Sequence, residues 1–338
     1  MRPPLTTPNS ALLLALASLF AGCAASVEEL ISYEEDPALL VIERGGPTLS
    51  SVGTLTSTEQ ISLAGAGDHF ALSPSGTLGA VCLNKERRIQ LIDLSKMRRG
   101  EQIELGLSRS PADIEFIDDE RLLIGSASDG AVSLFDRDFG HAQQELDSGG
   151  QSATELVIEL STETFWVLDP ISGMVARMSW IRSAVQRSSH LAADLSGLFY
   201  NEKGGELWVL SSEAGRIFVL NADDLALERE LECADHPSGL AFDHSGDAWV
   251  AHQDSNEVLK LDPITGSVKS RVILPLGEAG ESPHPSQLLI DDEGHRIHVV
   301  CPGSDSIQII DIQLERCVAS VDELRSPAAL TKSPLVLR

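Results

Sequence analysis

A short frame recurs along the chain, and it constrains the fold more than any other feature. In residues 249–262 an apolar run is followed by a polar turn, an alternating segment and an Asp. The last position of this frame recurs at 53, 93, 136, 179, 221, 262 and 311, with spacings of 40, 43, 43, 42, 41 and 49 residues. Alternation of apolar and polar residues predicts strands. About four short strands in each unit of about 42 residues predict an all-β, seven-bladed β-propeller.

The ends of the repeat predict how the ring closes. A second signature, clearest in residues 237–246, lies between successive frames and predicts an inner strand. The first frame, near Leu39, has no such signature before it. Residues 326–334 begin this signature again. We therefore expect a C-terminal strand to complete the first blade and leave no open sheet edge. Within the repeats, residues 181–193 alone suggest a helical turn or two.

The N-terminal residues predict export and a lipid anchor. The apolar run 11–22 is shorter than the roughly 20 residues that span a bilayer, and it has the length of a secretory signal core. Residues 19–23, Leu-Phe-Ala-Gly-Cys, resemble the lipobox of bacterial lipoprotein signal peptides. The resemblance implies cleavage before Cys23, lipidation of its thiol and stable membrane anchoring. The alternative is an ordinary signal peptide cut at residues 21–25.

We accordingly divide the chain into a signal peptide (1–22), a lipidated Cys with an acidic tether (23–36) and the propeller (37–338). Residue 24 is Ala rather than the Asp that retains lipoproteins at the inner membrane of enteric bacteria. The lipobox resemblance thus implies an outer-membrane lipoprotein of a Gram-negative bacterium, facing the periplasm or the cell surface.

The repeat units resemble YVTN-type β-propeller repeats of bacterial surface and periplasmic proteins, with the related NHL repeat close behind. The resemblance covers about residues 37–338 and is best in 237–266, PSGLAFDHSG followed by WVAHQDSNEVLKLDPITG. None of the repeats keeps the Asn of the namesake tetrapeptide, and the best copy reads WVAH at 249–252. Such propellers host binding, scaffolding and unrelated chemistries, so the resemblance implies a fold rather than an activity.

The charge of the chain limits its partners. It carries 51 Asp and Glu against 25 Lys and Arg, a formal net charge of −26. Nucleic-acid binding relies on Lys and Arg to meet the phosphates, and the excess of acidic residues disfavours it here. An acidic surface instead favours cationic partners or divalent ions.

Three side chains are candidates for a site at the central channel. His69, Asp113 and Glu155 occupy one position of the inner-strand signature in successive blades. Paired carboxylates there could hold Ca²⁺ or shift each other's pKa for acid–base work. Propeller lactonases resemble this arrangement, with a metal bound in the channel. The alternative is that Asp113 and Glu155 simply bond the ends of neighbouring inner strands.

A second set of candidates marks a ligand or partner face. The insertion at 274–285 accounts for the longest spacing between frames, and insertions in propellers go to loops that carry function. We expect a partner surface there. Its candidate residues are His236, Asp254, Glu281, His284 and Gln287.

The cysteines and tryptophans fit the core. Cys82, Cys233, Cys301 and Cys317 allow three disulfide pairings, and their spacings match no zinc site. We interpret them as small core residues. Trp166, Trp208 and Trp249 recur at one blade position, which predicts packing between blades.

No complete catalytic set accompanies this architecture. We therefore predict a monomeric, lipid-anchored envelope propeller without enzymatic activity or cofactor, which binds a protein or envelope ligand. The alternative is a metal-dependent hydrolase of the lactonase kind, with its site at the channel mouth. A quinone- or haem-linked dehydrogenase subunit is a third hypothesis.

Overall fold

The computed structural model describes residues 39–43, 46–52, 57–105, 109–138, 141–182, 184–192, 194–233, 236–291, 294–322, 324 and 327–332. The expected signal peptide, Cys23 and acidic tether lie outside the described residues, and residues Pro37–Arg338 form a unit of their own. No helix within the described residues has the length and apolarity that a membrane crossing requires.

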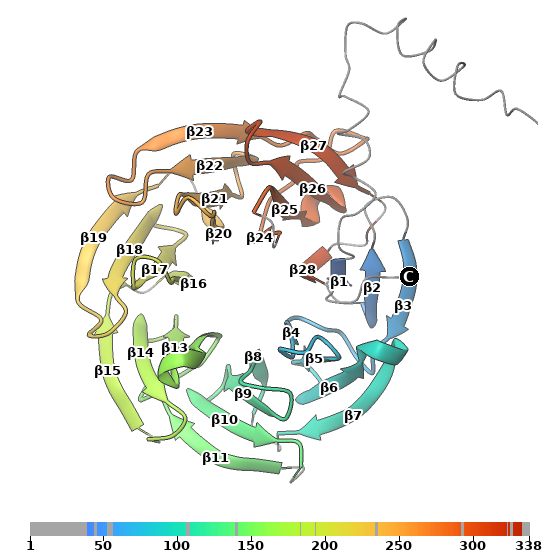
Figure 1. Cartoon of the computed structure of the whole chain (residues 1–338), viewed down its shortest axis with the longest axis vertical. Helices are drawn as coiled ribbons and strands as arrows, with labels where there is room; N and C mark the ends of the chain where they lie inside the picture. The colour runs from blue at the N-terminus through green and yellow to red at the C-terminus, as the bar shows by residue number, and fades with distance from the viewer. Residues whose placement is uncertain are drawn as a thin grey trace, which may run out of the picture. The chain divides into compact units, whose positions relative to one another are not determined.

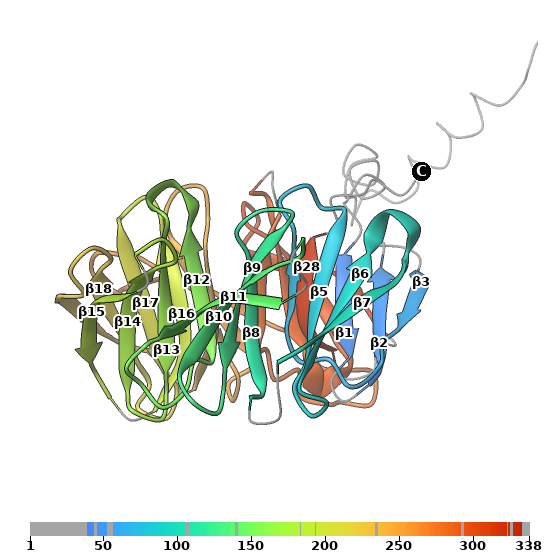
Figure 2. The same cartoon turned by 90° about the horizontal axis from the view of Figure 1, so that it is seen from below.

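Seven four-stranded antiparallel sheets are arranged around a central axis (Figure 1), which confirms the predicted seven-bladed propeller. Figure 2 shows the ring edge-on, with the inner strands running roughly along its axis. The inner strands of blades 1 to 7 are β28 (Pro327–Lys332), β4 (Phe70–Leu72), β8 (Pro111–Phe116), β12 (Glu155–Glu159), β16 (Leu195–Asn201), β20 (Pro237–Phe242) and β24 (Gln287–Ile290).

The remaining strands follow outward in the same order. The second strands are β1 (Leu39–Glu43), β5 (Leu78–Leu83), β9 (Arg121–Ser126), β13 (Thr164–Asp169), β17 (Glu206–Ser211), β21 (Ala248–His252) and β25 (Arg296–Cys301). The third strands are β2 (Thr48–Val52), β6 (Arg88–Asp93), β10 (Ala131–Asp136), β14 (Met174–Ser179), β18 (Arg216–Asn221), β22 (Glu257–Leu261) and β26 (Ser306–Asp311). The outer strands are β3 (Ser57–Ser62), β7 (Arg98–Glu104), β11 (His141–Asp147), β15 (Ala184–His190), β19 (Leu227–Glu232), β23 (Val268–Ile273) and β27 (Arg316–Val321). Three single 3₁₀ turns complete the described elements: η2 (Leu94–Lys96), η3 (Leu160–Thr162) and η4 (Pro302–Ser304).

The first blade is built from both ends of the propeller sequence, as predicted. β28 pairs antiparallel with β1, and the register places Leu40 opposite Thr331 and Ile42 opposite Ala329. β1 in turn pairs with β2. The C-terminal strand therefore supplies the inner strand that the first frame lacks.

The Asp at the end of the repeated frame shapes a turn. Asp262 Oδ1 accepts hydrogen bonds from the backbone N–H groups of Ile264 (3.0 Å) and Thr265 (2.9 Å). Short Asp side chains favour such turns because they bond the backbone a few residues on. The same contact recurs at Asp93, Asp136 and Asp311. These carboxylates are turn residues.

The helical turn expected at residues 181–193 is wrong. Residues 184–190 form β15, which pairs with β14 along its length. Outer strands pack against one neighbour only, so their sequence shows little alternation and the pairing decides the structure.

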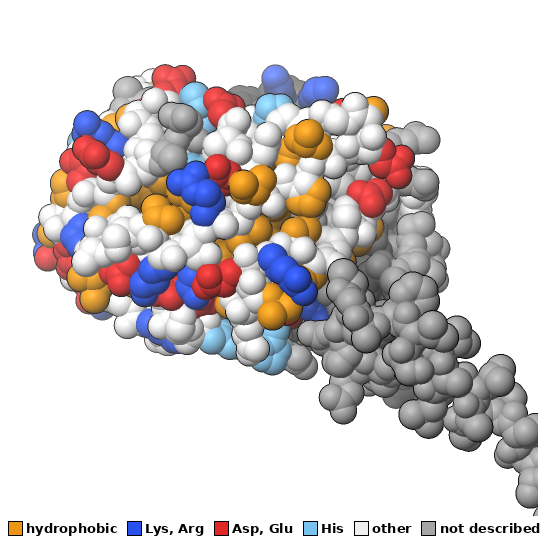
Figure 3. Space-filling model, turned by 90° about the horizontal axis from the view of Figure 1, so that it is seen from above, with side chains coloured by type: hydrophobic (Ala, Val, Ile, Leu, Met, Phe, Trp, Pro, Cys, Tyr) orange, Lys and Arg blue, Asp and Glu red, His pale blue; other side chains and the backbone are white. Residues whose placement is uncertain are grey.

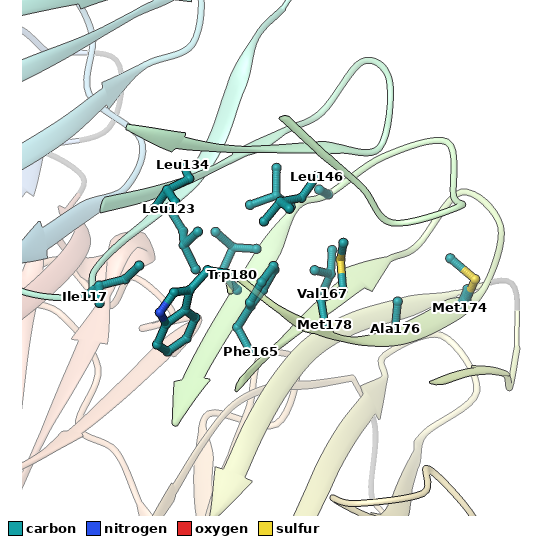
Figure 4. Close-up of a cluster of buried hydrophobic side chains, with 13 residues drawn as sticks. Ile117, Leu123, Leu134, Leu146, Phe165, Val167, Met174, Ala176, Met178 and Trp180 are labelled. Carbon is teal, nitrogen blue, oxygen red and sulfur yellow. The ribbon is translucent and has the colours of Figure 1, made fainter. Parts of the chain in front are cut away.

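Hydrophobic side chains fill the space between blades. Figure 4 shows one such cluster, in which Leu134 and Leu146 of blade 3 lie against Phe165 and Val167 of blade 4. The close fit of these surfaces fixes each blade relative to the next.

The recurring tryptophans have the predicted packing role. Trp208 on β17 is fully buried and meets Phe242 of the next blade edge-on, with ring centroids 5.2 Å apart. Trp166 on β13 likewise lies 4.9 Å from the ring of Tyr200 in the following blade. Each of these second strands therefore carries an aromatic anchor for its neighbour.

None of the four described cysteines is in a disulfide. Cys82 and Cys301 are fully buried, in agreement with a core role, and Cys233 and Cys317 are half-buried.

Candidate functional site

A cavity of about 850 Å³ lies at the inner strands, within the size range of small-molecule sites. It is lined from six blades and includes three of the predicted site residues from blades 2 to 4, His69, Asp113 and Glu155. Gln287, from the second candidate set, lines the same cavity. The structure thus brings these four residues to one place.

Asp113 and Glu155 both connect neighbouring inner strands. The backbone N–H of Leu156 in blade 4 donates to Asp113 Oδ2 in blade 3 at 2.7 Å. One blade further on, the N–H of Leu198 donates to Glu155 Oε2 at 2.6 Å. These contacts are those expected if the two carboxylates bond the ends of adjacent strands. They leave fewer carboxylate lone pairs for a metal.

His69 extends this arrangement to blade 2. Its Nδ1 lies 3.4 Å from Asp113 Oδ1. Burial alone would lower the pKa of His69, but the hydrogen bond to Asp113 and the charges of Asp113, Glu155 and Asp68 raise it to about 9. Near pH 7 this imidazole is therefore a cation beside a carboxylate.

Glu115 is a site residue that the sequence interpretation missed. It lies two positions after Asp113 on β8, and the two-residue period of a strand turns both side chains toward the cavity. Burial and the charge of Asp113 raise the pKa of Glu115 to about 8. Unlike Asp113 and Glu155, it makes no hydrogen bond to any of the described residues. Its carboxyl group is thus available to a ligand.

Burial and the charge of Asp113 also raise the pKa of Glu155 to about 8. Two carboxyl groups of the cavity are therefore mostly protonated near neutral pH. Both ionise readily when a positive charge arrives, because a cation favours the charged form of a carboxyl group.

The opposite side of the cavity is neutral. Its lining from blades 5 to 7 is polar but uncharged and comprises Ser196, Ser212, Ser238, Gln253, Ser286 and Gln287 beside apolar residues. Gly239 in β20 belongs to this side, and a Cβ atom there would lie 2.8 Å from the backbone oxygen of Ser286 in the next blade. The inner strands approach too closely for a side chain at this position.

His236 and Asp254, two residues of the predicted partner face, bond each other. His236 Nδ1 lies 2.6 Å from Asp254 Oδ2. Four consecutive blades have an equivalent contact between the loop that leads into the inner strand and the end of the second strand or the turn after it. The pairs are Arg109–Asp129, Ser152–Asp169, Asp194–Ser211 and His236–Asp254. We call the surface formed by these loops and turns the mouth face. The contact holds a loop in place, and half of each side chain in the His236–Asp254 pair is still exposed.

The other two predicted face residues lie in the insertion before blade 7. Glu281 is exposed, and its carboxylate accepts a hydrogen bond from the backbone N–H of Ala279 at 3.0 Å. The exposed His284 donates its backbone N–H to Asn256 Oδ1 at 3.4 Å. Neither side chain lines the cavity.

Metal chemistry has little support in this geometry. Within the described residues, no group of three or more His, Cys, Asp and Glu side chains is arranged to hold a metal ion. His69, Asp113 and Glu155 are engaged with one another or with backbone amides.

The outer surface has a mixed character. Figure 3 views the side of the ring that carries β23 and β27, where hydrophobic, acidic and basic side chains alternate over short distances. Val268 and Ile273 of the outer strand β23 are exposed hydrophobic side chains. The cavity differs from this surface. Its lining residues include Asp and Glu but neither Lys nor Arg.

Comparisons with known proteins support the fold and little beyond it. No family model matches the chain. Over 151 residues the chain is 27% identical to a Caenorhabditis elegans protein described as "Probable peptidyl-alpha-hydroxyglycine alpha-amidating lyase", a match that covers 41% of this chain and 40% of that protein. The chain therefore spans less than half the length of this curated relative.

Two solved structures share the propeller architecture. The WD40 β-propeller domain of Doa1 has a TM-score of 0.63 and 16% identity, with 80% of this chain and 87% of that chain covered. Hydrazine synthase of Kuenenia stuttgartiensis has a TM-score of 0.64 and 12% identity, with 80% and 94% covered. At these identities the likeness concerns the fold alone.

Proposed function

We propose that this protein is a ligand-binding propeller of the bacterial envelope, and that its ligand places a positively charged group in the central cavity. The observation that carries the proposal is the cavity itself, which has carboxyl groups on one side and neutral polar groups on the other. A ligand there meets carboxyl groups at one end, two of which ionise when a cation arrives, and neutral hydrogen-bonding groups along the rest. Proteins and peptides with exposed Arg or Lys have this chemistry.

Two further features favour a cationic ligand. The net charge of −26 attracts cations over long distances and speeds their encounter with the protein. Glu115 supplies a carboxyl group that is not used in the hydrogen bonds between the described strands, so pairing with a guanidinium group need not break a bond between blades. Bidentate bonding between guanidinium and carboxylate groups is among the stronger polar contacts.

Binding of tri-arginine amide tests the proposal by titration calorimetry at pH 8.5, with tri-glutamate as the opposite-charge control. We expect tri-arginine to bind and tri-glutamate not to. Glu115→Gln should weaken tri-arginine about tenfold, since a charged hydrogen bond contributes about 1.5 kcal/mol or more. The matched control is Glu104→Gln, which removes the same charge from a side chain that is 73% exposed on the outer strand β7. Equal affinities for the two variants, or no binding by the wild type, would contradict the proposal.

The lipid anchor is part of the same proposal and rests on the lipobox resemblance at Cys23. When the full chain is made in a Gram-negative host, we expect it to fractionate with outer membranes. Cys23→Ser should release it into the soluble periplasmic fraction, because the thiol is the acceptor of the lipid. A Cys23→Ser protein that stays in the membrane fraction would rule out this anchor.

The alternative hydrolase would require Asp113 and Glu155 to exchange their backbone partners for a metal. Metal analysis of the purified protein separates the two functions. Stoichiometric Ca²⁺ or Zn²⁺ that is lost in an Asp113→Ala, Glu155→Ala double variant would favour the hydrolase.

A further inference from the structure

A thiol and an imidazole lie together beside the mouth face. Cys233 follows the outer strand β19, and its Sγ lies 3.5 Å from Nε2 of His252 at the end of β21. Cys233 is half-buried, whereas His252 is fully buried. A nucleophile within hydrogen-bond reach of a base is the arrangement that activates thiols.

The other described cysteines have a different setting. Burial raises the pKa of the Cys82 thiol well above its usual value and that of Cys301 to about 12. Cys317 is half-buried like Cys233, but its thiol donates to the backbone oxygen of Ala319 at 3.5 Å, and burial raises its pKa. Oxygen acceptors of this kind are poor bases. Among the described thiols, Cys233 is thus distinguished by its imidazole neighbour.

Solvent reaches this part of the fold. The segments that carry Cys233 and His252 also carry His236 and Asp254, whose side chains are 47% and 54% exposed. Cys233 itself is only half-buried, so a small oxidant can reach its side chain.

We propose that Cys233 is a peroxide-reactive thiol and that His252 is its base. Nε2 takes the thiol proton as Sγ attacks one oxygen of hydrogen peroxide. The O–O bond breaks, and the departing hydroxide receives the proton from the imidazole and leaves as water. The sulfur is oxidised to a sulfenic acid and the peroxide is reduced, so one peroxide gives one Cys–SOH and one water. Added thiol reverses the oxidation. One thiol condenses with the sulfenic acid to give a mixed disulfide and water, and a second thiol reduces this disulfide to the free cysteine.

The test follows each thiol of the full chain by peptide mass spectrometry. With limiting iodoacetamide at pH 7, we expect Cys233 to be alkylated at least about tenfold faster than Cys317, because the thiolate is the reactive form. With hydrogen peroxide and a dimedone trap, sulfenic acid should form at Cys233 and not at Cys82, Cys301 or Cys317. Equal rates at Cys233 and Cys317, or trapping elsewhere, would overturn the proposal.

The role of His252 has its own readouts. In the wild type, the alkylation rate of Cys233 should rise with pH to a plateau. The midpoint of this rise should lie below about 8.5, which is the pKa of an ordinary thiol. His252→Gln should bring the rate of Cys233 at pH 7 close to that of Cys317. Because His252 is fully buried, this variant is compared with the wild type by circular dichroism. If it does not fold, the pH profile of the wild type decides: a midpoint at or above 8.5 would eliminate His252 as the base.

Discussion

Removal of residues 326–338 is expected to abolish cooperative unfolding of the propeller. The deletion takes away β28 and leaves the inner edge of β1 unpaired along Leu39–Glu43. Residues 39–42 of that strand are buried, so the loss exposes both hydrophobic side chains and unpaired backbone groups. An open edge also invites pairing with other chains. The truncated protein should melt broadly at lower temperature and aggregate.

Thermal unfolding followed by circular dichroism checks this expectation. The matched control is removal of residues 333–338 alone, which keeps β28. We expect the protein with this shorter deletion to unfold at the same midpoint temperature as the full chain. A 326–338 deletion with an unchanged midpoint and an equally sharp transition would show that β28 does not close the ring in solution.

Trp208→Ala is expected to cost about 3–5 kcal/mol of the free energy of unfolding. The side chain is fully buried between blades 5 and 6, and truncation leaves a cavity against Phe242. It also removes an indole N–H that donates to Glu206 Oε2 at 3.0 Å. Denaturant titration measures the loss.

Two variants calibrate that measurement. Leu227→Ala in the same blade changes a side chain that is 51% exposed and should cost less than about 1 kcal/mol. Trp208→Phe should recover much of the stability, because it keeps an aromatic ring at the interface. A cost below about 1 kcal/mol for Trp208→Ala would mean that this position does not hold the two blades together.

The repeat architecture could be predicted because its determinants are local. The hairpin between the second and third strands, the Asp turn at Asp262 and the buried Trp position all lie within one frame of sequence. Their spacing is therefore visible without knowledge of any partner strand. The outer strand β15 was mispredicted for the opposite reason, because its conformation depends on pairing with β14.

The candidate site was predictable only in part. The repeat placed His69, Asp113 and Glu155 around one channel, but their partners come from the next blade and have no signal in the local sequence. Glu115 could have been found, since the strand period that points Asp113 inward applies to it as well. The contact between Cys233 and His252 joins segments of two neighbouring blades and could not be predicted from either segment alone.

The central claim is that a cation enters the cavity and meets carboxyl groups that are protonated beforehand. Calorimetric titration with tri-arginine amide at pH 7, repeated in buffers of different ionisation enthalpy, counts the protons exchanged on binding. Because the pKa values of Glu115 and Glu155 are about 8 and that of His69 is about 9, a nearby cation should expel about one proton or more. Binding without proton release, or with proton uptake, would contradict the account.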